Sequence, residues 1–206
     1  MKIIVCVRWR LGKKVLQTIN EFHDIVSVIT DNEEIVEYCI ANSLKYIRLE
    51  NNNDWENAFY EEHDLIVSCM FNKIISENHL SKAKFGGINI HQSILPSYRG
   101  KSPVLMALKD RADTIGFTIH YMTSAVDAGN ILVQNFWYLD YEQTMEELMN
   151  QYITLVPSAL IISLGLVASK LNGLEQDGFQ VTYCESIDFE FDWNLRLNQI
   201  IKLMER

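Results

Sequence analysis

The chain has 206 residues, of which 48% are hydrophobic and 22% charged, so it is long and apolar enough to bury a core of its own. Its formal net charge of −9 excludes a broad nucleic-acid-binding surface, because phosphate backbones are bound by basic patches. A local basic pocket for one or two phosphates is compatible with this charge.

The N-terminus runs directly into an apolar, β-branched segment, residues 2–7, which is typical of a buried parallel strand. It lacks the charged, apolar and small-residue parts of a secretion signal, so we expect a cytoplasmic protein. The cysteines are scattered without the C-x-x-C spacing of a zinc site. This predicts buried free thiols in a reducing compartment and no metal.

The first 85 residues alternate between predicted strands and helices. Strands are expected at residues 2–7, 24–30, 46–49 and 65–69, and helices at 12–22, from 33 to about 42, within 51–62 and within 71–80. Asp31 or Asn32 is expected to cap the second helix, whose first turn is acidic. This alternation implies βαβ crossovers and therefore a parallel sheet.

The second half of the chain adds further strands and one long helix. Strands are expected at residues 86–91, 116–122, 130–139 and 180–184, and helices at 103–109, 144–171 and 194–204. Thr144 and Glu147 have the spacing of a capping box, and Asn172-Gly173 is expected to end the long helix, with Pro157 as a candidate kink. We therefore predict an α/β fold with a doubly wound, mostly parallel sheet.

Residues 153–169 are almost wholly apolar and raise the question of a membrane span. Pro157, Ser163 and Gly165 interrupt the run, which stays below the about 18 uninterrupted apolar residues that indicate a transmembrane helix. We therefore expect a buried core helix and no membrane association. Part of so apolar a helix would otherwise face water, so we also expect a homodimer.

The turn after the first strand, residues 8–14, is strongly basic. It holds one glycine and four cations, so it is not the G-x-G-x-x-G fingerprint of a dinucleotide-binding fold. Backbone N–H groups at a helix N-terminus and basic side chains together hold phosphates. We therefore expect Arg8, Arg10 and Lys13 to bind a phosphate of the substrate, with a solvated surface loop as the alternative.

The strand at residues 86–91 ends in a polar loop and carries residues suited to chemistry. Asn89 and His91 alternate with two isoleucines, so an amide and an imidazole share one face at the carboxyl end of the strand. Open α/β folds place their active sites at such strand ends. Asp127 lies in a Gly-containing turn after a later strand and could return a carboxylate to His91.

Three segments of the chain form an ordered set of motifs. They read Ile-Asn-Ile-His-x-Ser-x-Leu-Pro-x-Tyr-Arg-Gly-x-x-Pro at residues 88–103, Gly-x-Thr-Ile-His at 116–120 and Val-Asp-x-Gly-x-Ile-Leu-x-Gln at 126–134. Together they resemble the folate-dependent formyltransferase family, which includes glycinamide ribonucleotide, methionyl-tRNA and sugar-nucleotide N-formyltransferases. The resemblance implies a formyltransferase catalytic domain at residues 1–184 and a small C-terminal tail with a terminal helix at 185–206.

The resemblance also implies a catalytic set of Asn89, His91 and Asp127, and N10-formyltetrahydrofolate as the formyl donor. The implied folate contacts are Met70, Phe71, Lys73, Ile74, Val126 and Asp127, and the implied acceptor contacts of the polar loop are Tyr98, Arg99 and Gly100. His120 belongs to the same motif set and is expected to have a structural or supporting role.

Elementary chemistry agrees with these roles. A formyl group passes to a neutral amine through a tetrahedral intermediate that carries an oxyanion, and a donor such as the Asn89 amide contributes about 3 kcal/mol to its stabilisation in comparable sites. His91 can also stabilise the oxyanion and take the proton of the amine, since imidazole titrates near neutrality. Asp127 would orient His91 and raise its basicity.

Differences between this chain and the individual classes of the family reduce the number of candidate acceptor substrates. The basic turn at residues 8–14 does not match the Gly/Ser-rich phosphate loop of the glycinamide ribonucleotide enzymes. The tRNA enzymes carry a further C-terminal β-rich domain, whereas this acidic chain stops at Arg206. The formyl-folate hydrolases carry an extra N-terminal domain, whereas the fold here is expected to begin at Met1.

We therefore expect the acceptor to be a nucleotide-linked amino sugar, such as a dTDP- or GDP-linked 4-amino-4,6-dideoxyhexose for surface polysaccharide (lipopolysaccharide O-antigen), and no nucleic acid partner. Aromatic side chains of the tail around Trp193 could stack on the nucleotide base, with core packing as the alternative. Two other interpretations stay open. One is an N-formyltransferase for an amino acid or a hydroxyornithine-type metabolite, and the other is a non-catalytic folate-binding protein.

Overall fold

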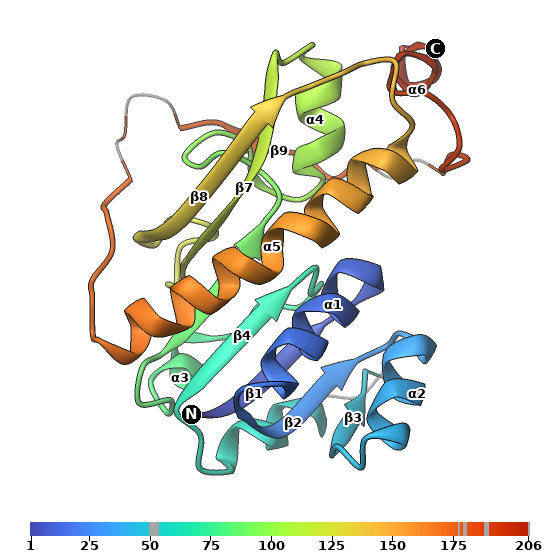
Figure 1. Cartoon of the computed structure of the whole chain (residues 1–206). Coiled ribbons are helices and arrows are strands. Elements are labelled where there is room, and N and C mark those ends of the chain that lie inside the picture. The colour runs from blue at the N-terminus through green and yellow to red at the C-terminus, as the bar shows by residue number, and fades with distance from the viewer. Residues whose placement is uncertain (50–53, 177, 179–180, 188–189, 206) are drawn as a thin grey trace.

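Seven strands form one mixed sheet (Figure 1). The computed structural model describes residues 1–206 with the exception of 50–53, 177, 179–180, 188–189 and 206. Along the sheet the strands follow the order β3 (Tyr46–Arg48), β2 (Asp24–Thr30), β1 (Lys2–Val7), β4 (Leu65–Cys69), β5 (Gly87–His91), β7 (Thr114–Tyr121) and β8 (Ile131–Tyr138). The first five in this order are parallel, whereas β7 and β8 are antiparallel to their neighbours. The predicted α/β fold with a mostly parallel sheet is therefore confirmed.

The apolar composition of the central strands explains their place in the sheet. β1 and β4 are paired, and all of their residues except Lys2 are buried, because apolar layers cover both faces. α1 (Trp9–Asn20) and α2 (Glu33–Ala41) follow β1 and β2 in the sequence, as predicted. α2 begins where the Ile35 backbone N–H donates to the Asn32 side chain at 3.2 Å, which identifies Asn32 as its cap.

Helices cover both faces of the sheet, but unequally. α1, α2 and α5 (Met145–Ala168) contribute to the larger apolar cluster on one face. A smaller cluster on the other face joins Ile4 and Ile66 of the sheet to η1 (Asp54–Tyr60), a 3-10 helix within the predicted helical region, and to α3 (Glu77–Leu80). On β5 and β7 this second face carries polar side chains instead of apolar ones.

α5 is the longest helix and runs along the sheet beside α1 (Figure 1). The predicted capping box starts it, because the Glu147 N–H donates to Thr144 Oγ1 at 3.1 Å and the Thr144 N–H donates to the Glu147 carboxylate at 2.7 Å. The helix continues through Pro157 and ends at Ala168, earlier than predicted. It ends there because Lys170 has a left-handed backbone with φ of 58°.

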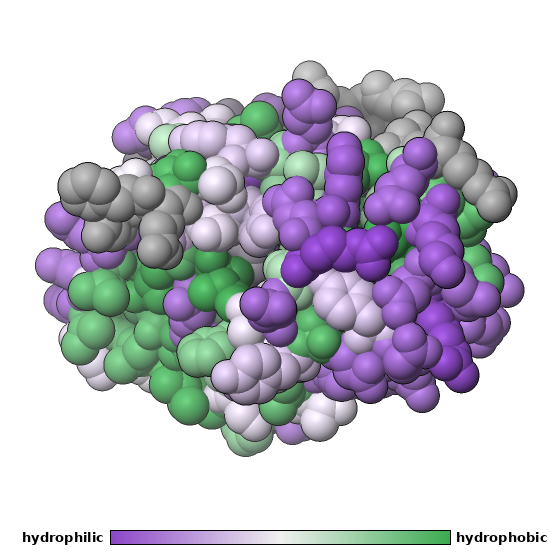
Figure 2. All heavy atoms as spheres, turned by 90° about the horizontal axis from the view of Figure 1, so that it is seen from above, coloured by the Kyte–Doolittle hydropathy of each residue, from purple (hydrophilic) through white to green (hydrophobic). Residues whose placement is uncertain are grey.

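By length and composition α5 is also the one helix of the described residues that could cross a membrane. One side of it is buried in the core, where the Tyr152 hydroxyl donates to the Gly116 carbonyl at 3.1 Å. The other side exposes Leu155, Ile161 and Ile162, with exposed fractions of 36%, 47% and 56%. Hydrophobic side chains also gather on one side of the molecule in the view from above (Figure 2). α5 thus forms a layer of the α/β core with an apolar outer surface, and the homodimer stays a prediction.

The C-terminal part of the chain returns to the main fold. β9 (Tyr183–Cys184) pairs in parallel with β6 (Arg99–Gly100), and the predicted strand is therefore shorter than expected, with Gln180 outside the described residues. α6 (Leu197–Met204) begins later than the predicted residue 194 and packs against α4 (Pro103–Lys109). Three of its apolar residues are fully buried in the larger cluster, namely Leu197, Ile200 and Ile201.

Candidate active site

Asn89 and His91 on β5 and His120 on β7 share one face of the sheet. The antiparallel register pairs Asn89 with His120. Ile88 and Ile90, which alternate with the two polar residues of β5, are buried in the larger cluster on the opposite face. The alternation in the sequence therefore brings an amide and two imidazoles together, on the part of the sheet that the smaller apolar layer does not cover.

Asp127 joins these three side chains from the loop between β7 and β8. Its Oδ1 atom lies 3.3 Å from Asn89 Nδ2 and 3.4 Å from His120 Nε2, and its Oδ2 atom lies 3.4 Å from His91 Nδ1. The Gly100 backbone N–H donates to Oδ2 at 2.9 Å. The predicted return of the Asp127 carboxylate to His91 is confirmed. His120 lies as close to this carboxylate as His91 does, which the sequence did not indicate.

The electrostatics of the cluster favour an ionised carboxylate beside a neutral base. Burial by itself raises the pKa of Asp127, but the hydrogen bond from His120, the charges of both histidines and the Gly100 N–H together lower it to about 2. For His91, burial lowers the pKa below its usual range more strongly than Asp127 and the Tyr98 carbonyl raise it. At neutral pH, Asp127 is therefore charged and His91 is neutral.

Both nitrogens of the His91 ring face oxygen atoms. Nε2 donates to the Tyr98 backbone carbonyl at 2.7 Å, a contact that requires the proton on this nitrogen, and Nδ1 faces Asp127. Nδ1 is then the nitrogen that can accept a further proton, and the carboxylate stabilises the ring once it has done so. His91 is thus arranged as a buried base whose charged form has a carboxylate partner.

The loop that supplies the Tyr98 carbonyl is held from β7 and β8. Thr118 Oγ1 donates to the Ser93 carbonyl at 2.7 Å and accepts from the Leu95 N–H at 3.1 Å. Gln134 Nε2 donates to the Leu95 carbonyl at 2.9 Å and to Thr118 Oγ1 at 2.8 Å. Ser93, Thr118 and Gln134 all belong to the motif set of the sequence. In the structure they shape this loop and do not line the cavity described below.

The loop that carries Asp127 is a tight turn. Asp127 has a positive φ of 52°, which is uncommon for a residue with a side chain. Gly129 lies so close to β7 that a Cβ there would be 2.0 Å from the Tyr121 carbonyl oxygen. The turn therefore needs a glycine at position 129 to bring Asp127 back over the sheet.

The four polar side chains line a cavity of about 680 Å³. Gly100, predicted to contact the acceptor, lines it as well. All six residues predicted to contact folate belong to its wall: Met70, Phe71, Lys73, Ile74, Val126 and Asp127. The structure therefore brings the predicted folate contacts and the predicted catalytic residues to one cavity, while their roles stay predictions.

Other residues of the wall were missed or only partly anticipated. Trp9 and Lys101 line the cavity, and so do Phe191 and Trp193 of the C-terminal tail, whose ring centroids are 5.5 Å apart. Lys101 directly follows the motif residue Gly100, so its position in the sequence was a usable signal. Trp9 and Phe191 reach the site only through folding, and no local pattern marks them.

The basic segment at residues 8–14 is not the predicted turn, because α1 begins at Trp9 and not at residue 12, so Arg8 precedes the helix and the other six residues lie within it. It contributes only Arg8 and Trp9 to this cavity. Each of its three predicted phosphate ligands is already paired with an acidic side chain: Arg8 with Asp31, Arg10 with Glu146 and Lys13 with Glu34. Arg10 and Lys13 do not line the cavity, and acids before and within α2 and at the start of α5 pair with all three cations. Of the three, only Arg8 lines the cavity, and its contact with a phosphate stays a prediction.

Tyr98 and Arg99 were also predicted to contact the acceptor, and neither lines the cavity. Tyr98 uses its backbone carbonyl to hold His91. Arg99 is 8% exposed, and its guanidinium donates to the side-chain oxygen of Gln176. Both residues thus act on the shape of the loop in this structure.

The cavity is cationic although the chain is acidic. Lys73 and Lys101 line it, and so does Arg8, whose charge is paired with Asp31; Asp127 is the one carboxylate among the described residues of its wall. No described acidic side chain lies within ion-pair distance of Lys73 or Lys101. The Asp127 carboxylate faces His91 and His120, whereas the two lysines have no such partner among the described residues. The wall therefore offers positive charge to an anionic ligand.

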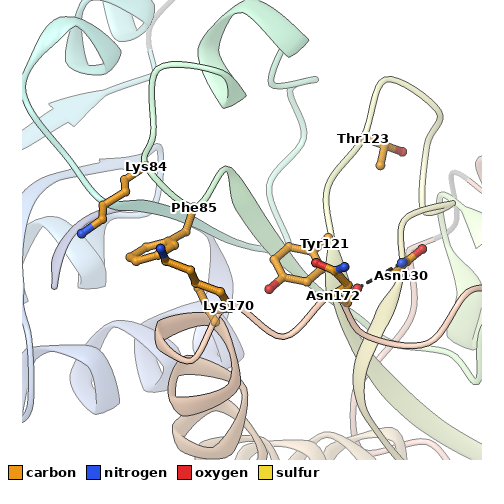
Figure 3. Close-up of a pocket in the computed structure, with 8 residues that line it drawn as sticks. Lys84, Phe85, Tyr121, Thr123, Asn130, Lys170 and Asn172 are labelled. Atoms are coloured by element: carbon orange, nitrogen blue, oxygen red, sulfur yellow. Dashed lines mark hydrogen bonds between the residues drawn. The ribbon is translucent and has the colours of Figure 1, made fainter.

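A second cavity, also of about 680 Å³, lies at the other end of β5 (Figure 3). Lys84, Tyr121 and Lys170 contribute to its wall, and the Asn130 amide donates to the Asn172 carbonyl at 3.0 Å beside it. Among the described residues that line it there is no histidine, cysteine or carboxylate. Since it holds none of the predicted catalytic residues, we place the candidate active site in the first cavity.

Comparisons with known proteins identify relatives of the chain. A family model described as formyl transferase matches residues 11–164. The methionyl-tRNA formyltransferase of Staphylococcus epidermidis is 27% identical to this chain, over 97% of this chain and 70% of its own length.

Solved structures share the fold. The crystal structure of a formyltransferase from Anoxybacillus kamchatkensis, in complex with UDP-4,6-dideoxy-4-formamido-L-AltNAc and tetrahydrofolate, superposes with a TM-score of 0.67 at 22% identity and covers 98% of both chains. An N-formyltransferase from Helicobacter canadensis, in complex with folinic acid and dTDP-3-aminofucose, gives a TM-score of 0.73 at 18% identity, over 89% of this chain and 70% of the other. At these identities the structures establish the fold, and the family model, which spans most of the chain, establishes the membership. The chain belongs to the formyl transferase family.

Proposed function

We propose that this formyl-transferring enzyme moves the formyl group of N10-formyltetrahydrofolate to the amino group of a nucleotide-linked amino sugar. The observation that carries the proposal is the cavity, where an amide, two imidazoles and an ionised carboxylate lie beside two lysines without a described acidic partner, in a chain of net charge −9. Formyl-folate carries carboxylates and a sugar nucleotide carries a diphosphate, so both substrates are anions that suit this charge.

The related structures support a sugar nucleotide as the acceptor. Both of the solved formyltransferases named above hold a nucleotide-linked sugar, and one of them matches over 98% of both chains. The cavity of the present protein also offers flat aromatic surfaces, since Trp9, Phe191 and Trp193 line it. Such rings stack on a pterin or on a nucleotide base, and thereby hold planar ligands without using charge.

The geometry also suggests how the chain would assist the transfer. When the amine nitrogen attacks the formyl carbon, the formyl oxygen becomes negatively charged and needs a hydrogen-bond donor. The Asn89 amide is the donor we propose, because Asp127 Oδ1 lies 3.3 Å from its nitrogen and accepts one of its two N–H bonds, which leaves the other for the oxyanion.

The proton of the reaction has a route through the same cluster. The amine loses one proton when the new C–N bond is complete, and N10 of the folate gains one when its bond to the formyl carbon breaks, so the transfer needs no net proton. His91 Nδ1 lies 3.4 Å from the Asp127 carboxylate, which stabilises the protonated ring while it carries this proton. The neutral state of His91 at rest leaves Nδ1 free to accept it.

A formylation assay tests the proposed acceptor. The wild-type protein is incubated with N10-formyltetrahydrofolate and a panel of UDP-, dTDP- and GDP-linked amino sugars, and we expect one or more of them to gain a formyl group, detected by mass spectrometry. Asn89→Ala is the control that lacks the proposed donor. A wild-type protein that binds the folate and formylates none of these sugars would contradict the proposed acceptor.

Methionyl-tRNA is the second candidate acceptor, because the Staphylococcus epidermidis relative bears that activity in its name and matches 97% of this chain. The net charge of −9 opposes the binding of a polyanion as large as tRNA. Adding charged initiator tRNA to the same panel decides between the two. Formylation of an amino acid or a hydroxyornithine, or folate binding without any transfer, would favour the remaining interpretations of the sequence.

A further inference from the structure

The segment that follows α5 connects the two loops that hold the catalytic cluster. Leu174 pairs with Ile131 at the start of β8, with both N–H···O bonds at 2.8 Å. Further along, Thr182 Oγ1 accepts from the Tyr98 N–H at 2.7 Å, next to the pairing of β9 with β6. Gln176 lies between these two anchors.

Gln176 uses every hydrogen-bonding position of its amide. Its Oε1 atom accepts from Arg99 Nε at 3.1 Å and from Arg99 Nη2 at 2.6 Å. Its Nε2 atom donates to the Asp127 carbonyl at 2.9 Å and to the Gly129 carbonyl at 2.7 Å. Two donors and two acceptors fill the capacity of a glutamine side chain, so these contacts define a single orientation.

We propose that Gln176 is a positioning residue of the active site, which fixes the Asp127 loop relative to β6 and thereby keeps the catalytic carboxylate in reach of its partners. The Gly100 N–H donates to Asp127 Oδ2, and Gln176 bonds to Asp127 and to the residue that precedes Gly100. On one side it holds the backbone of Asp127 itself, and on the other it holds Arg99, the immediate neighbour of Gly100.

The residue type at this position follows from the same contacts. Arg99 is nearly buried and needs an acceptor, which a glutamate would also supply. A glutamate cannot donate, however, so it would face the Asp127 and Gly129 carbonyls with a charged oxygen. Only an amide can accept from the guanidinium and donate to the turn at the same time. A glutamate at this position therefore tests the bonds to the Asp127 turn separately from the bonds to Arg99.

Three variants test the proposal by steady-state kinetics and thermal unfolding. Gln176→Glu keeps the acceptor for Arg99 and loses both donors to the turn, whereas Gln176→Ala loses all four bonds. Gln151→Ala is the matched control, since Gln151 is a half-buried glutamine whose amide donates to the Gln143 side chain at 3.0 Å, outside the site.

We expect kcat to fall by about tenfold to a hundredfold in both Gln176 variants, because small displacements of a catalytic group cost this much, with a smaller change of KM. The bonds of the glutamate to the Arg99 guanidinium should offset part of the cost of facing two carbonyls, so the melting temperature of Gln176→Glu should fall no further than that of Gln176→Ala. Gln151→Ala should keep its kcat even where it loses stability. Wild-type kcat in Gln176→Glu, or a loss of kcat in Gln151→Ala as large as in the Gln176 variants, would overturn the proposal.

The kinetic readout rests on the proposed formyl transfer, so a second readout uses no substrate. NMR titration of the His91 ring in Gln176→Ala should give a lower pKa than in wild type, because Asp127 raises this pKa and would be less well held. An unchanged His91 titration would overturn the proposal. A shifted titration in a protein that formylates nothing would support Gln176 while the proposed function failed.

Discussion

Asp127 contacts four groups at once: the Asn89 amide, the rings of His91 and His120, and the Gly100 N–H. The Asn89 amide and the Gly100 N–H donate to the carboxylate, and the charged form of either ring stabilises it further against the cost of its burial. Its pKa of about 2 keeps it charged at neutral pH. At the scale of single residues, this fixed charge would stabilise the protonated form of His91 in the proposed mechanism.

The exchange of Asp127 for Asn removes this charge at nearly constant volume. We expect kcat to fall by about 10²- to 10³-fold with a smaller change of KM, since the charge acts on the reacting groups more than on binding. Steady-state kinetics at pH 7 measure both constants. Asp113→Asn, at an exposed position before β7, is the control and should behave as wild type. An active Asp127→Asn enzyme would contradict the proposed role.

The lowered pKa of Asp127 also predicts an acid dependence of stability. Because the folded-state pKa is about 2 and the ordinary value is 3.8, the ionised group stabilises the fold by about 2 kcal/mol above pH 4, and this contribution is lost as the pH falls through about 2. Urea unfolding of wild type and Asp127→Asn between pH 6 and pH 2 measures it. The wild type should lose its advantage over the variant as the pH falls, and a constant difference would contradict the assignment.

At the scale of elements, the polar loop at residues 92–98 depends on strands that come later in the chain. The Thr118 hydroxyl on β7 serves two backbone groups of the loop and one side chain of β8. The loop in turn offers the Tyr98 carbonyl to His91. β7 and β8 therefore shape the candidate site as well as extending the sheet.

Thr118→Val removes the hydroxyl and keeps the shape of the side chain. We expect a loss of about 1–3 kcal/mol in the free energy of unfolding, because buried backbone groups lose their partners, and a lower kcat, because the Tyr98 carbonyl is less well placed. Chemical unfolding and kinetics measure the two effects. Thr154→Val on the exposed side of α5, where the hydroxyl donates to the Asn150 carbonyl at 2.8 Å, should change neither by as much.

The sequence predicts elements well where a local pattern determines them. β2 at Asp24–Thr30 and α4 at Pro103–Lys109 have their predicted bounds, because an apolar β-branched run and a proline at the helix start are sufficient signals. The same holds for the pairing of Asn89 and His91 on one face. Predicted bounds fail at the end of α5, where a left-handed Lys170 and not the Asn172-Gly173 pair ends the helix.

The sequence could not predict contacts that depend on tertiary structure. Arg10 and Glu146 are 136 positions apart, and nothing near Arg10 shows that an acid will neutralise it. The basic segment at residues 8–14 therefore suggested cations available to bind phosphate. In the folded chain, each of the three predicted ligands is paired with an acidic side chain. Gln176 was missed for the same reason, since its four hydrogen bonds are made to residues far from it in the chain.

At the scale of the whole molecule, the sign of the charge at the cavity is opposite to the sign of the net charge. The chain carries a net charge of −9, yet the described wall of the candidate active-site cavity has two lysines without a described acidic partner, an arginine paired with Asp31, and one carboxylate. Negative charge elsewhere on the surface repels anions in general, while the cavity offers them a local attraction. This arrangement favours small anionic substrates over extended polyanions.

Lys73→Ala and Lys101→Ala should each raise KM for the anionic substrates by about three- to tenfold, with little change in kcat, because they remove attraction and leave the reacting groups in place. The KM of wild type should also rise with salt, and this dependence should be weaker in the variants. Lys109→Ala, at the exposed end of α4, is the control. A KM that is independent of both lysines and of salt would contradict a cationic binding site.

Gly129 has no side chain, yet the position of Asp127 depends on it, because a Cβ there would lie 2.0 Å from the Tyr121 carbonyl oxygen. Selection should therefore tolerate as few substitutions at Gly129 as at Asp127. The reason is steric at Gly129 and chemical at Asp127. The wall residues Lys101 and Trp193 have no such restriction, so they can diverge as the preferred acceptor changes. Over evolution, Gly129 should therefore stay unchanged as long as the reaction does, although it has no functional group. The side chains at positions 101 and 193 should change with the substrate.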